Sequence, residues 1–146
     1  MAYFCGLPAC AIAKLQYVQN MAARIIFRLS KSDHISDSLK ELHWLPVRFR
    51  IDFKILCMVF KCTSGNAPMY LQNMIVLCNS RNTRSGSGIS LFIPRTKTKW
   101  GDRSFCVYGP RLWNTLPRCI RDVDDYLSFR KAVKTHLFRL AFPGDS

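Results

Sequence analysis

The chain has 146 residues, of which 49% are hydrophobic and 12% aromatic. This composition suits one domain with a packed core and excludes a disordered tail. The 22 Lys and Arg against 9 Asp and Glu give a net charge of +13, so polyanions are the first partners to consider. Nucleic acid ranks above an anionic membrane, because no basic amphipathic segment stands apart from the core pattern. The alternative is an ordinary solvated basic surface.

The first half of the sequence, residues 9–77, has helical periodicity. From residue 9 to about residue 30 the apolar positions recur every three or four residues, which predicts a helix that packs along that side. These positions are Leu15, Val18, Ala22, Ile25, Ile26 and Leu29. Ser32 or Asp33 can cap a short helix over residues 35–42, and Pro68 can begin another short helix.

A helix over residues 46–63 is the element around which we expect the fold to be built. Pro46 suits a first helical position. Two apolar stripes run along this helix, one of Phe49, Phe53, Leu56 and Phe60 and one of Ile51, Ile55, Met58 and Cys62. Two stripes require two sets of neighbours, which we expect to be the first and last helices. A basic edge separates the stripes and consists of Arg50, Lys54 and Lys61. Arg48 and Asp52 have the spacing of an i,i+4 ion pair.

The sequence changes character after residue 77. Residues 78–88 are rich in Ser, Asn, Arg, Thr and Gly and have no periodicity, which predicts a flexible loop. A short strand is predicted over residues 89–93, and turn signals follow at Gly101 and Gly109. We therefore expect a short β-hairpin or an irregular segment near residues 89–108.

A last helix is predicted over residues 125–140, with Asp124 and Asp125 at its positive end. Its buried stripe is expected to consist of Tyr126, Phe129, Val133, Leu137 and Leu140. The predicted fold class is mainly α. Residues 1–146 are expected to form a single small helical domain, with a basic strand or loop segment over residues 89–121.

Positive charge is concentrated in residues 81–121, which hold nine basic residues and one acidic residue. Aromatic residues are interleaved with these cations, and cations can contact phosphates while aromatic rings stack on bases. The predicted nucleic-acid-binding residues are Arg95, Lys97, Lys99, Arg103, Arg111 and Trp100. In a strand, the first three would share one face. For Phe105, Tyr108 and Trp113 a role in the core is favoured over stacking.

No catalytic or metal-binding constellation is evident in the sequence. Asp122, Asp124 and Asp125 precede a helix, where carboxylates serve as caps. Cys57 and Cys62 lie on different faces of the central helix, and no His follows at zinc-ligand spacing. Nucleophile elbows, phosphate-cradling Gly loops and Cys–His pairs are missing as well. We therefore expect no catalytic residue, no metal and no cofactor.

The cysteine pattern and the N-terminal residues bear on the compartment. Seven cysteines form an odd set without a spaced framework, which favours reduced thiols inside the cell, in the nucleus or the cytoplasm. Residues 1–13 are apolar, but no positively charged region precedes them and Gly6 and Pro8 interrupt the run, which argues against a signal peptide. No segment approaches the ~18 consecutive apolar residues of a membrane span, so no membrane association is expected.

An ordered series of short blocks extends over roughly residues 4–140. The blocks are Gly6-Leu-Pro, Leu15-Gln-Tyr-Val-Gln-Asn-Met-Ala-Ala-Arg, Lys31-Ser-Asp-His-Ile, Leu42-His-Trp-Leu-Pro-Val, Arg50-Ile-Asp-Phe-Lys-Ile, Ala67-Pro-Met-Tyr-Leu, Pro94-Arg-Thr, Gly101-Asp-Arg-Ser-Phe, Pro110-Arg-Leu-Trp-Asn-Thr-Leu-Pro and Phe129-Arg-Lys-Ala-Val-Lys-Thr-His-Leu-Phe. In this order they resemble the C-terminal region of LINE-type (non-LTR) retrotransposon reverse transcriptases, downstream of the polymerase domain. A whole ordered series is a more specific signal than any single block.

The resemblance implies an accessory segment that handles RNA or DNA during target-primed reverse transcription. It supplies no active site, because the family's catalytic aspartates and endonuclease residues have no matching positions in this chain. The implied partners are the phosphate backbone of RNA or DNA and the polymerase domain of a parent polypeptide. Two alternatives are an inert, truncated remnant of a retroelement and a host-recruited protein interaction module.

Overall fold

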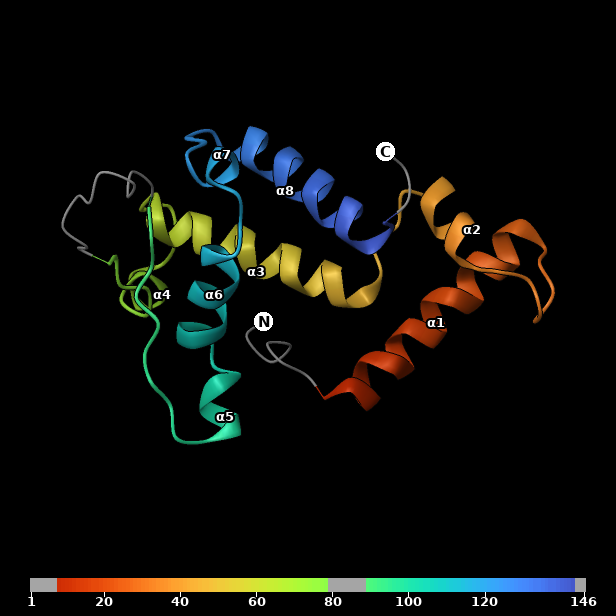
Figure 1. Cartoon of the computed structure of the whole chain (residues 1–146), viewed down its shortest axis with the longest axis horizontal. Coiled ribbons are helices and arrows are strands. Elements are labelled where there is room, and N and C mark those ends of the chain that lie inside the picture. The colour runs from red at the N-terminus through yellow and green to blue at the C-terminus, as the bar shows by residue number, and fades with distance from the viewer. Residues whose placement is uncertain (1–7, 79–88, 144–146) are drawn as a thin grey trace.

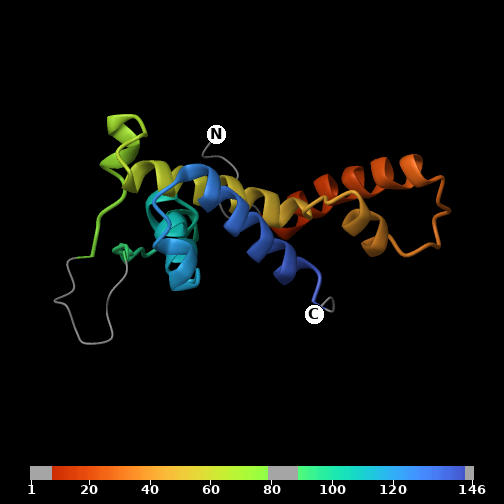
Figure 2. The same cartoon turned by 90° about the horizontal axis from the view of Figure 1, so that it is seen from above.

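The structure, a computed structural model, describes residues 8–78 and 89–143 and is mainly helical, which confirms the predicted fold class at that level. The helices of the described residues are α1 (Ala9–Phe27), α2 (Ser36–Glu41), α3 (Val47–Thr63), α4 (Met69–Gln72), α5 (Lys99–Asp102), α6 (Phe105–Asn114), α7 (Arg118–Arg121) and α8 (Tyr126–Ala141). In Figure 1, α8 runs along one side of α3, α6 crosses the other side, and α1 and α2 lie at one end. Figure 2 shows α1 and α2 extending away from the body formed by α3, α6 and α8. Within the described ranges, no helix combines the length and apolar character needed to cross a membrane.

α3 is the central helix, but it begins one residue later than expected. Pro46 has φ −52° and ψ 149°, so it is the extended residue before the helix and Val47 is the first helical residue. Leu56 and Val59 are completely buried on this helix, and Phe60 is 5% exposed. α3 packs against α8 and α6, and it also contacts α1. The contacts with the first and last helices were expected, whereas α6 was not recognised as a neighbour.

Three aromatic side chains join the three helices of the body. Phe60 of α3 stacks on Phe129 of α8 with ring centroids 4.3 Å apart, and Trp113 of α6 stacks on Phe129 at 5.5 Å. Pairs of this kind contribute about 0.5–1.5 kcal/mol each beyond the burial of their surface. The Trp113 Nε1–H donates a hydrogen bond to the Ile89 carbonyl at 3.1 Å, so this indole also fixes the segment that leads to α5.

Of the two alternatives predicted near residues 89–108, the β-hairpin is wrong; residues 89–98 are irregular and are followed by α5 and α6. Within the described residues no strand is present, and Leu77 and Leu91 form an isolated antiparallel bridge. The N–H and C=O groups of Leu91 pair with the Asn114 side chain, at 3.0 and 2.8 Å, so a side chain of α6 occupies groups that a second strand would need. Residues 79–88 of the predicted loop lie outside the described residues.

The turn predicted at Gly109 is also wrong, because Gly109 and Pro110 lie inside α6. Gly109 is needed there for close packing rather than for a turn. A Cβ at this position would stand 2.9 Å from Cγ2 of Val59, which is itself completely buried on α3. Pro110 is buried beside it, although a proline cannot donate the backbone hydrogen bond of a helix interior.

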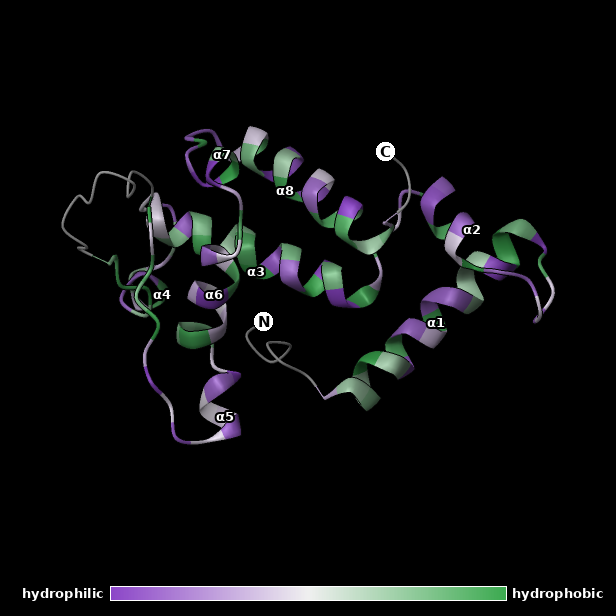
Figure 3. Cartoon of the chain, viewed as in Figure 1, coloured by the Kyte–Doolittle hydropathy of each residue, from purple (hydrophilic) through white to green (hydrophobic). Residues whose placement is uncertain are grey.

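α1 does not bury the apolar side that its periodicity predicts. Val18 is 65% exposed and Ile25 74%, whereas Gln19 and Ala23 are buried. Figure 3 shows hydrophobic residues along α1, the helix that extends away from the body formed by α3, α6 and α8. The helix ends at Phe27, short of the expected residue 30.

The predicted helix caps have a mixed outcome. At the start of α8 the Asp125 carboxylate accepts the Ser128 N–H at 2.7 Å, which confirms the expected cap. Asp33 does not cap α2, because its carboxylate accepts the Ser30 N–H at 2.7 Å instead. Along α8 the predicted stripe is buried in its middle, but Leu140 at its end is 55% exposed.

Candidate nucleic-acid interface

The predicted contacts gather around α5, a helix of four residues. The Thr98 hydroxyl oxygen caps this helix by accepting the Gly101 N–H at 3.1 Å. Gly101 lies so close to the preceding segment that a Cβ there would stand 2.9 Å from Cγ2 of Thr96. The chain before α5 therefore folds back against the helix and does not continue as a strand.

Arg95, Lys97 and Lys99 are all exposed, as a phosphate contact requires. The prediction that they share one face of a strand is wrong, because Lys99 is the first residue of α5 while the other two precede it. Their side chains belong to a tight reversal of the chain around α5. Arg81 and Arg84, which carry further charge in the sequence, lie outside the described residues.

Trp100 is the most exposed large apolar side chain of the described residues, at 80%. The Arg103 guanidinium lies over its ring, 5.4 Å from the centroid, which is the geometry of a cation–π contact. This contact gives the ring a defined neighbour without burying it. An exposed tryptophan beside a cation can stack on a nucleobase while the cation contacts a phosphate.

Asp102 organises the end of α5. Its carboxylate accepts a hydrogen bond from the Thr96 hydroxyl and lies 3.6 Å from the guanidinium of Arg111 on α6. The ion pair is half exposed on both sides, so it contributes little stability and water or a phosphate can compete for Arg111. Neither Asp102 nor Thr96 was predicted to belong to the site, although Asp102 is the single carboxylate in a basic segment of the sequence.

The aromatic residues beyond α5 pack in or against the core, as predicted. Phe105 and Trp113 are buried, at 5% and 1% exposure, so they belong to the core. The Tyr108 hydroxyl donates a 2.8 Å hydrogen bond to the Asp52 carboxylate, which is 6% exposed. Burial raises the pKa of Asp52, while the Tyr108 hydrogen bond and the positive charge of Arg48 oppose that rise. Asp52 is thus a buried link between α3 and α6, and not half of a surface ion pair.

The cysteines of the described residues divide into exposed and buried thiols. Among residues 8–78 and 89–143, no three His, Cys, Asp or Glu side chains are grouped so that they could hold a metal ion. Cys57 and Cys62 are both buried on α3, and burial raises the pKa of each thiol above its usual value. A thiol with a raised pKa is a poor nucleophile at neutral pH.

The geometry around α5 places exposed cations beside an exposed tryptophan. No family model matches the chain, and neither the curated proteins nor the solved structures include a match to it. The resemblance to the C-terminal region of LINE-type reverse transcriptases therefore stays a prediction.

Proposed function

We propose that the chain is a non-catalytic nucleic-acid-binding segment of a LINE-type retrotransposon reverse transcriptase, and that it grips the backbone of RNA or DNA around α5. The binding surface, called the α5 platform below, consists of Arg95, Lys97, Lys99, Trp100, Arg103 and Arg111. The observation that carries the proposal is the 80% exposure of Trp100 among five basic side chains. Such a combination can stack a base and contact its flanking phosphates together.

The position of α5 favours access to an extended strand. In Figure 1, α5 lies at the end of the α5–α6 arm that is farthest from α8. Arg95, Lys97 and Lys99 are exposed along the approach to it. Only Asp102 adds negative charge to residues 89–121, and it is already engaged by Thr96 and Arg111. A single strand following this approach would therefore meet little repulsion.

The proposal is tested by fluorescence anisotropy with a labelled single-stranded RNA of about 12 nucleotides, a length within the span that one such surface covers. Five phosphate contacts predict a slope of about −3.5 in a plot of log affinity against log salt. Replacing Arg95, Lys97 and Lys99 with Gln should make the slope shallower by about 2. Trp100→Ala should weaken binding by about 5- to 150-fold and leave the slope unchanged.

A matched control separates the α5 platform from general charge attraction. Replacing Lys131, Lys134 and Arg139 with Gln removes the same charge from exposed positions on α8. If this control weakened binding as much as the platform variant, the protein would bind RNA by net charge alone, as an inert remnant would. A flat response to salt would also contradict the proposal.

A further inference from the structure

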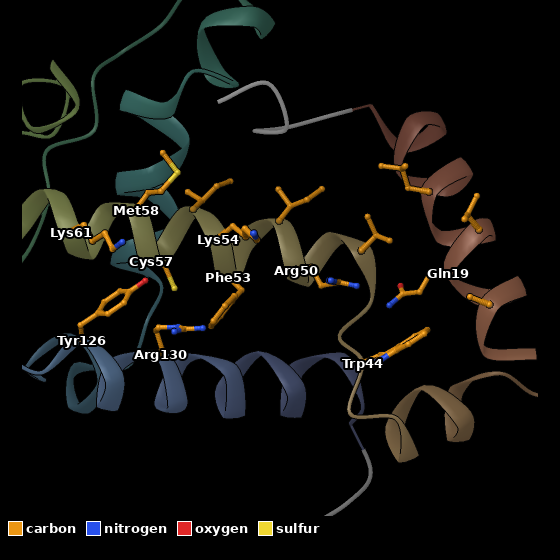
Figure 4. Close-up of a pocket in the computed structure, with 16 residues that line it drawn as sticks. Gln19, Trp44, Arg50, Phe53, Lys54, Cys57, Met58, Lys61, Tyr126 and Arg130 are labelled. Atoms are coloured by element: carbon orange, nitrogen blue, oxygen red, sulfur yellow. The ribbon is translucent and has the colours of Figure 1, made fainter. Parts of the chain in front are cut away.

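A groove of about 810 Å³ lies between α1, α3 and α8, away from the α5 platform. Figure 4 shows α3 along its floor, with side chains of α1 and of α8 forming the two sides. Much of its lining is apolar and includes Leu15, Val18, Ala22, Val47, Ile51 and Phe53. Of these, Leu15 is 42% exposed and Val18 is 65% exposed, so the side contributed by α1 is uncovered.

The polar part of the lining is positively charged. Arg50, Lys54 and Lys61 follow one another along α3, and Arg130 faces them from α8. All four side chains are exposed, and none of the described residues that line the groove is Asp or Glu. Tyr126 lies between the two helices, with Lys61 Nζ 4.9 Å and the Arg130 guanidinium 5.6 Å from its ring centroid. The groove therefore combines an apolar floor with a cationic rim.

Two glutamines fix α1 relative to the start of α3. The Gln19 side chain, 7% exposed, donates to the Leu45 carbonyl at 3.0 Å. The Gln16 side chain accepts the N–H of Val47 at 2.9 Å, and this N–H is one that the first turn of a helix cannot satisfy internally. The side formed by α1 is thus tied by hydrogen bonds to the start of α3, which forms the floor.

We propose that this groove binds an amphipathic α-helix of a partner protein, with an apolar stripe directed into the floor and acidic residues directed at the rim. The lining of α3 extends from residue 47 to residue 61, about 21 Å along the helix axis, which matches a partner helix of about four turns. Arg50, Lys54 and Lys61 are spaced so that they lie along one side of α3. Acidic residues with the same helical spacing on the partner would meet them in order.

The positive charge of the rim argues against a second copy of the chain, and the apolar floor argues against a nucleic-acid strand, as occupants of the groove. Each copy of this chain carries a net charge of +13, and the rim would place cations against cations if a second copy docked there. A nucleic-acid strand would satisfy the rim but would place phosphates over an apolar floor. An acidic amphipathic helix matches both the floor and the rim. This docking is independent of nucleic-acid binding at the α5 platform.

The probe is a labelled synthetic peptide of about 16 residues with Leu at helical i, i+3 and i+4 spacing and Glu on both flanks. The comparison peptide has Lys in place of every Glu. The full chain should bind the acidic peptide in an anisotropy titration and bind the basic peptide at least about tenfold more weakly. The double variant Arg50→Glu with Lys54→Glu cancels the charge of the four-residue rim and should abolish that preference.

The matched control is Lys131→Glu with Lys134→Glu, which makes the same charge change at exposed positions of α8 outside the groove lining. It should leave peptide binding within about twofold of wild type. Val18→Asp should weaken binding of the acidic peptide without disturbing the core, because this side chain is 65% exposed. Circular dichroism checks that each variant is folded.

Several results would overturn the proposal. Equal binding of both peptides, or equal weakening by the rim and control variants, would show that the rim does not select the partner. A dimer in sedimentation that the Arg50→Glu, Lys54→Glu pair abolishes would assign the groove to a second copy. Loss of binding to phosphatidylserine vesicles in that same pair, without peptide binding by wild type, would assign it to lipid. Trp100→Ala should leave peptide binding unchanged, so failure at the α5 platform and failure at the groove are distinguishable.

Discussion

Gly109→Ala tests the close crossing of α6 over α3. The added Cβ would stand 2.9 Å from Cγ2 of Val59, whereas carbon atoms prefer about 3.5–4.0 Å. Val59 is completely buried, so either α6 must move away or the core must expand. Overpacking of this kind costs about 1–3 kcal/mol, and the better helix propensity of Ala returns up to about 1 kcal/mol. We expect a net loss of about 1–2 kcal/mol, and thus a Tm lower by about 3–6 °C in a chain of this length.

Urea and thermal unfolding, followed by circular dichroism, measure this loss. The matched experiment adds Val59→Ala to Gly109→Ala, because the smaller side chain removes the atom that the new Cβ would strike. The two substitutions should together cost less than the sum of their separate effects, by about 0.5–3 kcal/mol. A Gly109→Ala variant as stable as wild type would show that α6 is not seated this closely on α3, and the reasoning would fail.

Two carboxylates should give opposite pH profiles. Burial raises the pKa of Asp52 above its ordinary value of 3.8, although the Tyr108 hydrogen bond and the charge of Arg48 oppose this rise. Wild type should therefore lose stability relative to Asp52→Asn as the pH rises from 3.8 through the raised pKa of the folded state. Urea midpoints across that range check this, and a pH-independent difference would contradict it. The hydrogen bonds from Ser128 lower the pKa of Asp125, so the stability that Asp125 contributes should be present above 3.8 and be lost as pH falls through its lowered folded pKa. Thermal melts of Asp125→Ala should therefore lie below wild type at neutral pH and converge with it in strong acid.

The long helices of the body could be predicted because their local signals agree. The periodic apolar residues of α3 and α8 face a core on the side that their sequence indicates, with Leu56 and Phe129 completely buried. Asp125 stands at a helix N-terminus in a position that its short polar side chain favours. In these segments tertiary packing strengthens a preference that is already present in the sequence.

α6 could not be predicted from the same kind of signal. Gly109 followed by Pro110 is typical of a turn, and each residue disfavours a helix interior. Contact with α3 stabilises this helix. The absence of a Cβ at Gly109 allows close approach to Val59, and the burial of Trp113 adds to the stability of the packed helix. A contact between residues 50 positions apart cannot be inferred from either segment alone.

For α1 the periodicity indicated an apolar side but not what would cover it. The Gln19 side chain donates to the Leu45 carbonyl, and the Gln16 side chain accepts the N–H of Val47, the first residue of α3. In this position Val18 and Ile25 remain exposed. A glutamine in an amphipathic pattern is ordinarily assigned to the polar side. The groove therefore could not be predicted from the sequence, because it forms only where α1, α3 and α8 come together in the fold.

The cations and the tryptophan around α5 could be predicted from the charge distribution of the sequence, but their arrangement could not. Lys99, Trp100 and Arg103 are neighbours in sequence, so their proximity follows from chain connectivity. The pairing of Asp102 with Arg111 crosses the boundary between α5 and α6. Gly101, inside α5, allows the preceding segment at Thr96 to fold back against the helix. The prediction of a strand there would have separated these groups.

The surroundings of the basic edge of α3 change the function that we propose for it. In the sequence, Arg50 and Lys54 are cations on a scaffold helix, with less claim to bind phosphate than the residues around Trp100. In the structure they border an apolar groove, and for this reason we propose an amphipathic partner for them and not a bare polyanion. Binding to the α5 platform is proposed to depend on counterion release and so should weaken steeply with salt, whereas apolar burial in the groove is largely insensitive to moderate salt. The two proposed surfaces therefore differ in the force that would drive binding as well as in position.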